Sequence, residues 1–153
     1  MRLYFLVEGR RTEAIVYPGW LAHLVPGLTR IRRHDDAADN SYFLLSAEGY
    51  PSIQEYLASA VDDVNAAGNY DYLIVSLDAD ESSVDERAEE VSEMLATRGA
   101  ILRGTRLVTI VQNRCIETWF LGNLVLRQPE NREEKPSRLG APRVFSPLRH
   151  RGV

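Results

Sequence analysis

The segment that decides the fold spans residues 72–81 and reads Tyr72-Leu73-Ile74-Val75-Ser76-Leu77-Asp78-Ala79-Asp80-Glu81. Its first six residues form a nearly continuous apolar run, which is typical of a strand buried on both faces of a parallel sheet. Because side chains alternate along an extended chain, Asp78 and Asp80 are expected on one side and Ala79 on the other. Two like charges this close repel, and such a pair is a candidate site for a hard cation. In the alternative interpretation, one Asp caps the following helix and the other is solvated.

A second run of the same kind, Leu3–Val7, is followed at once by Glu8 and Gly9. Further patterns predict strands at 29–33, 42–45 and 106–111, and helices at 12–24, 51–68, 83–99 and 115–124. This alternation predicts an α/β fold, a Rossmann-like, mostly parallel sheet flanked by helices. If the chain winds outward and then crosses back, the strand at 72–77 lies beside the first strand. Glu8 and the two aspartates then meet where ligands bind in such sheets, at the carboxyl ends of the strands.

The helix predicted at 12–24 carries apolar side chains at Ile15, Val16, Trp20 and Leu24, which we expect to form its buried face. Pro18 within it is expected to kink or split the helix. The helix predicted at 83–99 opens with a capping box, Ser83 with Glu86.

Composition narrows the class of protein. The chain has 153 residues, 44% hydrophobic and 26% charged, as in one ordinary globular domain. A net charge of −4 excludes a protein whose whole surface is basic and coats nucleic acid, although a local basic groove is compatible with this charge. Cys115 is the one cysteine, so no intrachain disulfide can form and a reducing cytoplasm is the expected location. No apolar segment approaches membrane-spanning length, so no membrane association is expected. Residues 127–153 contain four prolines and many charges, and are expected to form an irregular tail.

Two short motifs, Val7-Glu8-Gly9 and Leu77-Asp78-Ala79-Asp80, resemble the Toprim domain of topoisomerases, primases and related nucleases over residues 1–126. The segments 11–13 and 113–120 are similar to small stand-alone bacterial Toprim proteins related to overcoming-lysogenization-defect nucleases. The resemblance implies a Mg²⁺ or Mn²⁺ site whose metal ligands would be Glu8, Glu13, Asp78, Asp80 and Glu117. It also implies a partner ATPase in a phage-defence system.

Metal-assisted phosphodiester cleavage of nucleic acid is the expected activity, with Glu8, Asp78 and Asp80 as catalytic residues. Substrate phosphates are expected at three arginines that flank the acids: Arg10, Arg11 and Arg114. Each assignment has an alternative: Glu13 as a residue favourable to the helix dipole, Glu117 as a solvated side chain, and the arginines as ordinary surface.

The main alternative function is a non-catalytic Toprim-like module that docks on a partner protein. A receiver domain is disfavoured because Lys135 is the only lysine, and a dinucleotide-binding domain because no Gly-x-Gly-x-x-Gly follows either strand. The sequence leaves open whether the substrate is DNA or RNA and whether the chain forms a homo-oligomer.

Overall fold

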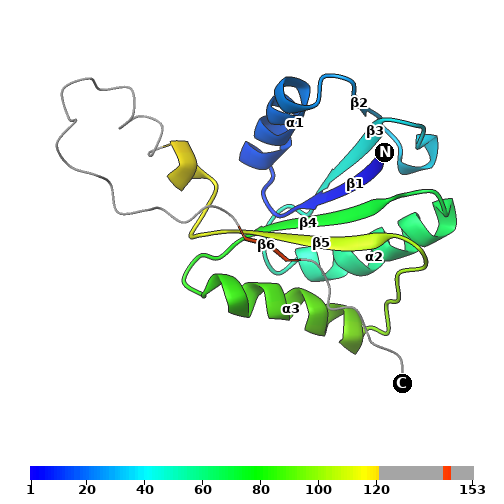
Figure 1. Cartoon of the computed structure of the whole chain (residues 1–153). Coiled ribbons are helices and arrows are strands. Elements are labelled where there is room, and N and C mark those ends of the chain that lie inside the picture. The colour runs from blue at the N-terminus through cyan, green and yellow to red at the C-terminus, as the bar shows by residue number, and fades with distance from the viewer. Residues whose placement is uncertain (121–142, 146–153) are drawn as a thin grey trace, which may run out of the picture.

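The computed structural model describes residues 1–120 and 143–145, and they form one six-stranded sheet with helices on both faces (Figure 1). The strands are β1 (Arg2–Val7), β2 (Thr29–Arg30), β3 (Ser41–Ser46), β4 (Tyr72–Asp78), β5 (Arg106–Gln112) and β6 (Arg143–Phe145). Their order is β2-β3-β1-β4-β5-β6. The first five are parallel, and β6 runs antiparallel to β5. The predicted α/β class and mostly parallel sheet are therefore confirmed.

The two central strands are β1 and β4, and their apolar runs are buried between helices on either face. All five residues from Leu3 to Val7 are buried in β1, as expected for a strand covered on both sides. β4 pairs with β1 in a register that places Ser76 opposite Val7. The chain first reaches the edge strand β2, then β3, and only then crosses β1 to reach β4. The predicted adjacency of the first strand and the acidic strand is thereby confirmed.

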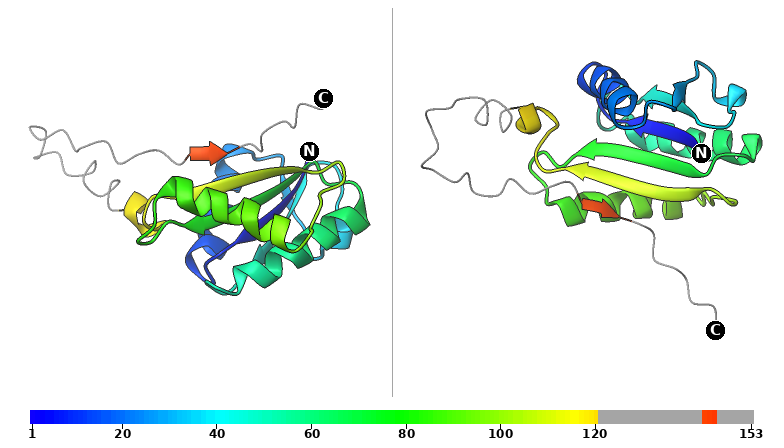
Figure 2. Two further views of the ribbon diagram at one scale, coloured as in Figure 1. Left: turned by 90° about the horizontal axis from the view of Figure 1, so that it is seen from below. Right: turned by 45° about the horizontal axis from the view of Figure 1, so that its top comes forward.

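The helices are α1 (Thr12–Leu24), α2 (Ile53–Ala67) and α3 (Val84–Thr97), with a short 3₁₀ helix at His34–Asp36 and a helical turn at 117–120. α1 covers one face of the sheet, and α2 and α3 cover the other (Figures 1 and 2). Each face has its own hydrophobic core, with Leu57 and Val61 central to the α2 side and Phe5 to the α1 side. The predicted capping box of α3 is present: Ser83 Oγ accepts from Glu86 N at 3.2 Å, and Glu86 Oε2 accepts from Ser83 N at 2.8 Å.

The buried face expected for α1 is correct for Val16 and Trp20, which pack against the core, and wrong for its other two residues. Ile15 and Leu24 are more than 70% exposed, whereas the helix buries Glu13 and Tyr17. The helix also continues through Pro18 without being split. A proline removes one N–H donor from the helix, and the neighbouring turns hold their conformation here because Tyr17 and Trp20 pack against the sheet and each other. The buried face of α1 is therefore defined by a carboxylate and a phenol, a pattern that apolar periodicity does not detect.

The second half of the chain is only partly described. β6 lies within the tail expected at 127–153, and it adds a strand beside β5 (Figure 2). The other residues of that tail, and residues 121–124 of the last predicted helix, lie outside the described residues. β2 is shorter than the predicted strand at 29–33. Among the helices that the structure describes, none combines the length and the apolar character needed to cross a membrane.

Candidate active site

Glu8 and Asp78 meet at the carboxyl ends of β1 and β4, the side facing left in Figure 1. The main chain of Glu8 continues the ladder between these strands, with Glu8 N donating to Ser76 O at 2.9 Å. Its side chain then turns across to the neighbouring strand, where Oε2 accepts from Asp78 N at 3.0 Å. Glu8 is only 8% exposed, so its carboxyl is held in place by burial as well as by this hydrogen bond.

Glu13 joins this pair from the first turn of α1 because of Gly9. Gly9 N donates to Glu13 Oε1 at 3.0 Å, and the side chain of Glu13 is buried. A Cβ atom at position 9 would lie 1.8 Å from Glu13 Oε2, so any other residue there would displace the Glu13 carboxylate. The glycine of the Glu8-Gly9 motif therefore allows the close approach of this carboxylate to the backbone. Glu8 precedes the turn between β1 and α1 and Glu13 follows it, so negative charge is concentrated at the end of β1.

Asp80 reaches the same region by leaving the extended conformation. Ala79 packs into the core on the α2 side, and its N–H donates to Gln112 O at 2.9 Å. Asp80 has φ of 50°, a left-handed conformation that Asp tolerates better than most residues. Its N–H donates to Arg114 O at 2.8 Å, which ties the loop after β4 to the loop after β5. Strict strand alternation therefore ends at Asp78, but Asp80 remains within electrostatic range of Glu8 and Asp78.

Glu117 approaches from the helical turn at 117–120. Its Oε1 accepts a hydrogen bond from Thr12 Oγ1 at 2.8 Å, and this bond connects the helical turn to the start of α1, 105 residues away in sequence. Glu117 is exposed, and the hydrogen bond from Thr12 lowers its pKa below the ordinary value. We call the five side chains that converge here the acidic cluster: Glu8, Glu13, Asp78, Asp80 and Glu117.

The acidic cluster has perturbed electrostatics centred on Asp78. Burial first, and then the charges of the four other carboxylates, together raise the pKa of Asp78 to about 7. The pKa of Glu8 is also raised, first by burial and then by Asp80 and Glu13, whereas the Asp78 N–H and Arg87 oppose the rise. Negative charge is therefore in excess at this edge of the sheet, and a cation would relieve it.

One arginine supplies positive charge from within the protein. Arg87, in α3, is 8% exposed, and its Nη2 lies 3.7 Å from Asp80 Oδ2. Its Nη1 also donates to Glu90 Oε2 at 2.7 Å, and the guanidinium lies 4.5 Å from the centre of the Tyr50 ring. Because Arg87 is shared between Asp80 and Glu90, one arginine does not neutralise the cluster. No pattern in the sequence predicts a buried Arg87, because it lies in a helix otherwise rich in exposed glutamates.

The donor chemistry of the acidic cluster suits a hard divalent ion, since every side chain offers carboxylate oxygen. In the part of the chain that the structure describes, however, no group of three or more His, Cys, Asp or Glu side chains is arranged so that it could hold a metal ion. The carboxylates therefore share one charged neighbourhood without forming a coordination shell. A bound cation would have to draw side chains together, and exposed Asp80 and Glu117 have the freedom to move.

The three arginines expected to bind substrate all lie at this edge, and all are exposed. Arg10 lies 3.3 Å from Glu48, and Arg114 lies 3.7 Å from Glu81, each in a solvent-exposed ion pair. Arg11 directly precedes α1. Exposed ion pairs of this kind contribute little to stability, so these side chains are free to change partners.

Three buried polar residues beneath the acidic cluster were not predicted from the sequence: Tyr17, Ser76 and Gln112. The hydroxyls of Tyr17 and Ser76 are hydrogen-bonded at 2.7 Å. Burial raises the pKa of Tyr17, and Glu13 and Asp78 raise it further. A usable signal was present for Tyr17, which follows Glu13 by four residues and so lies on the same side of α1.

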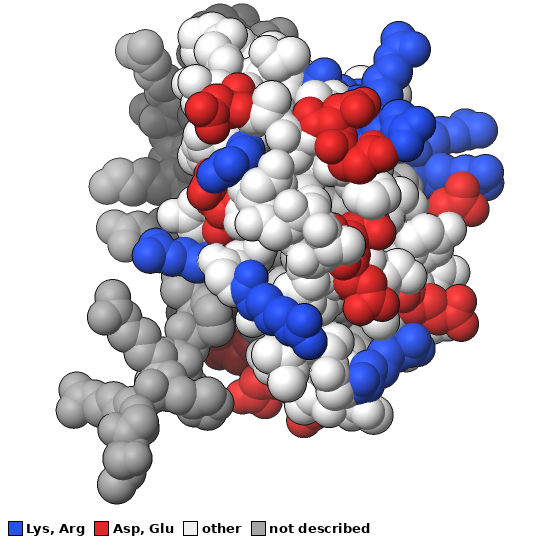
Figure 3. Space-filling model, turned by 90° about the vertical axis from the view of Figure 1, so that its right-hand side faces the viewer, with Lys and Arg blue, Asp and Glu red and all other residues white. Residues whose placement is uncertain are grey.

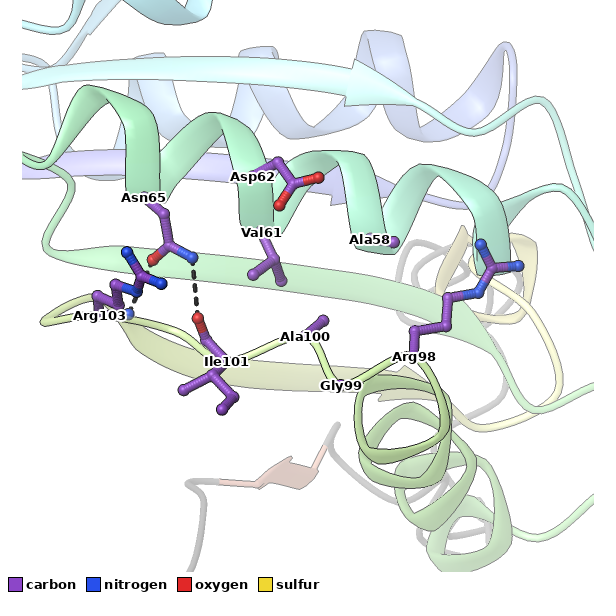
Figure 4. Close-up of a pocket in the computed structure, with 9 residues that line it drawn as sticks. All are labelled: Ala58, Val61, Asp62, Asn65, Arg98, Gly99, Ala100, Ile101 and Arg103. Atoms are coloured by element: carbon purple, nitrogen blue, oxygen red, sulfur yellow. Dashed lines mark hydrogen bonds between the residues drawn. The ribbon is translucent and has the colours of Figure 1, made fainter.

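Two other features of the described residues, a pocket and a charged face, do not form a competing site. A pocket of about 220 Å³ lies between α2 and the α3–β5 connection (Figure 4). The side chain of Asn65 holds that connection in place by donating to Ile101 O and accepting from Arg103 N, both at 2.8 Å. Arg98 and Arg103 lie at opposite ends of the pocket. Figure 3 looks at the amino ends of the parallel strands and shows both signs of charge spread over that face. Neither feature gathers groups that act on one ligand.

Comparison with protein-family models, with curated proteins and with solved structures finds no match for this chain. A proposal about function therefore has to rest on the acidic cluster and on the motifs that form it. The elements that carry the cluster are β1 and β4 with the residues that follow them, the first turn of α1 and the helical turn at 117–120.

Proposed function

We propose that this protein is a divalent-cation-dependent phosphodiester hydrolase that cleaves nucleic acid. The observation that carries the proposal is the concentration of four other carboxylates around Asp78, whose pKa is raised to about 7. Such a concentration costs free energy in the absence of a cation, and perturbed carboxyls of this kind gather at functional sites. The position also agrees, since ligands of open α/β sheets bind at the carboxyl ends of the central strands.

Mg²⁺ or Mn²⁺ would be held by the carboxylates of the acidic cluster, with Glu8, Asp78 and Asp80 as the central three. When bound, the ion supplies charge stabilisation at the phosphate and lowers the pKa of a coordinated water. Glu8 is suited to hold or release a proton at its carboxyl, because burial and its acidic neighbours raise its pKa above the ordinary value. Arg10, Arg11 and Arg114 are exposed at the same edge and would orient the substrate through its phosphate oxygens.

The resemblance to stand-alone Toprim proteins gives the proposal its biological setting. In that setting the chain is a cytoplasmic nuclease of a bacterial phage-defence system and works with a partner ATPase. The net charge of −4 supports a partner, because phosphate neutralisation by basic side chains supplies most non-specific affinity for nucleic acid. We expect weak cleavage by the isolated protein and faster cleavage when a partner presents the substrate.

One observation favours a second function, a non-catalytic Toprim-like module that docks on a partner protein. The carboxylates do not form a coordination shell within the described residues. In a silent module the same acids would serve to fix the loops after β1 and β4, as the hydrogen bond from Asp78 N to Glu8 does.

A cleavage assay separates the two functions. DNA and RNA, single- and double-stranded, are incubated with the full chain in Mg²⁺, Mn²⁺ or EDTA, with and without the product of the neighbouring gene. Glu8→Gln keeps an acceptor for Asp78 N but loses the charge, and Glu55→Gln, an exposed position on α2, is the matched control. Metal-dependent cleavage that is lost in Glu8→Gln and kept in Glu55→Gln supports the nuclease. Absence of cleavage in every condition, or equal cleavage by both variants, supports the docking module.

A further inference from the structure

Gln112 ends β5 directly beside the acidic cluster. It is the register partner of Asp78 in the β4–β5 ladder, and its side chain is 2% exposed. A buried primary amide offers two donors and an acceptor, and leaving them without partners is costly. The surroundings of this amide therefore determine its orientation.

Only one orientation of the Gln112 amide satisfies its neighbours. In it, Nε2 donates to Leu77 O and to Asp78 Oδ1, both at 2.8 Å, and Oε1 faces the hydroxyls of Tyr17 at 3.1 Å and Ser76 at 3.0 Å, either of which can donate to it. The opposite orientation would point Oε1 at a carbonyl and a carboxylate, which are both acceptors. Tyr17 and Ser76 have one proton each, and with Oε1 facing them one hydroxyl can donate to the other while the second donates to Gln112.

From this geometry we propose that Gln112 is a positioning residue, whose side-chain amide fixes the Asp78 carboxyl and is itself fixed by Tyr17 and Ser76. The inference rests on the proposed function for its consequence, which is a prearranged ligand. A carboxylate whose Oδ1 is already held loses less freedom when a cation binds. Side chains that orient a ligand in this way typically change metal affinity by about 10-fold to 100-fold when removed.

Two features of the contact make glutamine specific at this position. The amide donates to a carboxylate whose other neighbours are mostly acids, so it holds Asp78 without adding negative charge. A glutamate of the same shape would place a sixth carboxylate against Asp78 and would lack the N–H donor. The buried hydroxyls of Tyr17 and Ser76 lie on the far side of the amide, and they come from two elements, α1 and β4, that face each other.

The first test measures Mn²⁺ binding to the full chain by calorimetry in Gln112→Met and Tyr17→Phe. Methionine keeps the length and volume of the side chain but makes neither hydrogen bond. We expect Gln112→Met to weaken Mn²⁺ binding by about 10-fold or more, and Tyr17→Phe by less than about 3-fold, since the contact to Asp78 stays. A merely structural role would lower the stability of both variants and leave the affinity of the folded protein unchanged. Equal Mn²⁺ affinity in folded Gln112→Met and wild type would overturn the proposal.

The second test needs no metal and no Gln112 variant that folds. Side-chain amide protons of Gln112 are followed by ¹⁵N nuclear magnetic resonance in the metal-free protein and in Asp78→Ala. Loss of the carboxylate acceptor should make one of the two protons exchange with solvent about 10-fold faster, as expected for one hydrogen bond to a charged group. Unchanged exchange overturns the inference. Failure of the wild type to bind Mn²⁺ would count against the proposed function alone, and the amide protons would still decide the role of Gln112.

Discussion

Replacing Asp78 by asparagine removes the charge around which the acidic cluster is built, and we expect the metal-free protein to become more stable. Because the pKa of Asp78 is raised from 3.8 to about 7, the native state retains a proton that the unfolded chain releases between these pH values. The free energy of unfolding of the wild type therefore falls as pH rises through this window and levels off above about pH 7.

The size of the effect follows from the pKa change. A difference of about 3 in pKa corresponds to roughly 4 kcal/mol. The hydrogen bond from Gln112 Nε2 to Asp78 Oδ1 favours the charged form and opposes the rise, so we expect about 2 kcal/mol. Asparagine keeps an acceptor for that amide and carries no charge. Asp78→Asn should therefore exceed the wild type in stability by about 2 kcal/mol at pH 8, and by less than about 1 kcal/mol at pH 5.

The assay is urea unfolding in EDTA at pH 5, 6, 7 and 8. Asp62→Asn is the matched control, because Asp62 lies exposed on α2, and its stability should differ from the wild type by less than about 0.5 kcal/mol at each pH. Adding Mg²⁺ should raise the stability of the wild type more than that of Asp78→Asn. A variant less stable than the wild type at pH 8 in EDTA would refute the reasoning, since the carboxylate would then be a stabilising cap.

Three further changes test other parts of the fold and site by urea unfolding. Gly9→Ala places a Cβ atom 1.8 Å from Glu13 Oε2 and should cost about 2 kcal/mol, whereas exposed Gly19→Ala should cost nothing; similar stability of the two would contradict the packing of Glu13. Arg87→Gln removes the buried cation shared by Asp80 and Glu90 and should lower the free energy of unfolding by about 2 kcal/mol, with exposed Arg98→Gln as the control. A loss below about 0.5 kcal/mol in Arg87→Gln would contradict this expectation. Ser83→Ala breaks the capping box and should cost about 1 kcal/mol; Ser92→Ala, exposed within α3, should not be destabilising, and equal losses would mean that the cap contributes nothing specific.

The α/β class and the meeting of Glu8 with Asp78 could be predicted from the sequence because both depend on local signals. Two long apolar runs identify central parallel strands, and crossover rules then restrict where their ends lie. The acids follow these runs directly, so the topology alone brings them to one edge of the sheet. The same reasoning identified α2 and its stop at Gly68, which has φ of 65°.

The residues that surround and hold the acidic cluster could not be predicted, because their positions depend on tertiary packing. Apolar periodicity assigned Ile15 and Leu24 to the core, whereas α1 buries Glu13 and Tyr17, which are held by Gly9 N and Ser76. Arg87 is buried against the Tyr50 ring, Asp80 after β4 and Glu90 one turn further along α3. Gln112 is one polar residue at a strand end, and only the register with Asp78 reveals its role. The contacts of Arg87 with Tyr50, of Tyr17 with Ser76 and of Gln112 with Asp78 join residues that are distant in sequence, and no pattern in a single segment encodes them.

The central claim is that the acidic cluster binds a divalent cation, and Mn²⁺ binding followed by electron paramagnetic resonance tests it most directly. The full chain at pH 7.5, above the raised pKa of Asp78, is titrated with Mn²⁺ alongside the double variant Glu8→Gln/Asp78→Asn. We predict saturable binding to the wild type that Mg²⁺ displaces, and at least about 10-fold weaker binding to the double variant, whose folding is checked by circular dichroism. Absence of saturable binding at millimolar Mn²⁺, or equal binding by the folded double variant, would contradict the claim.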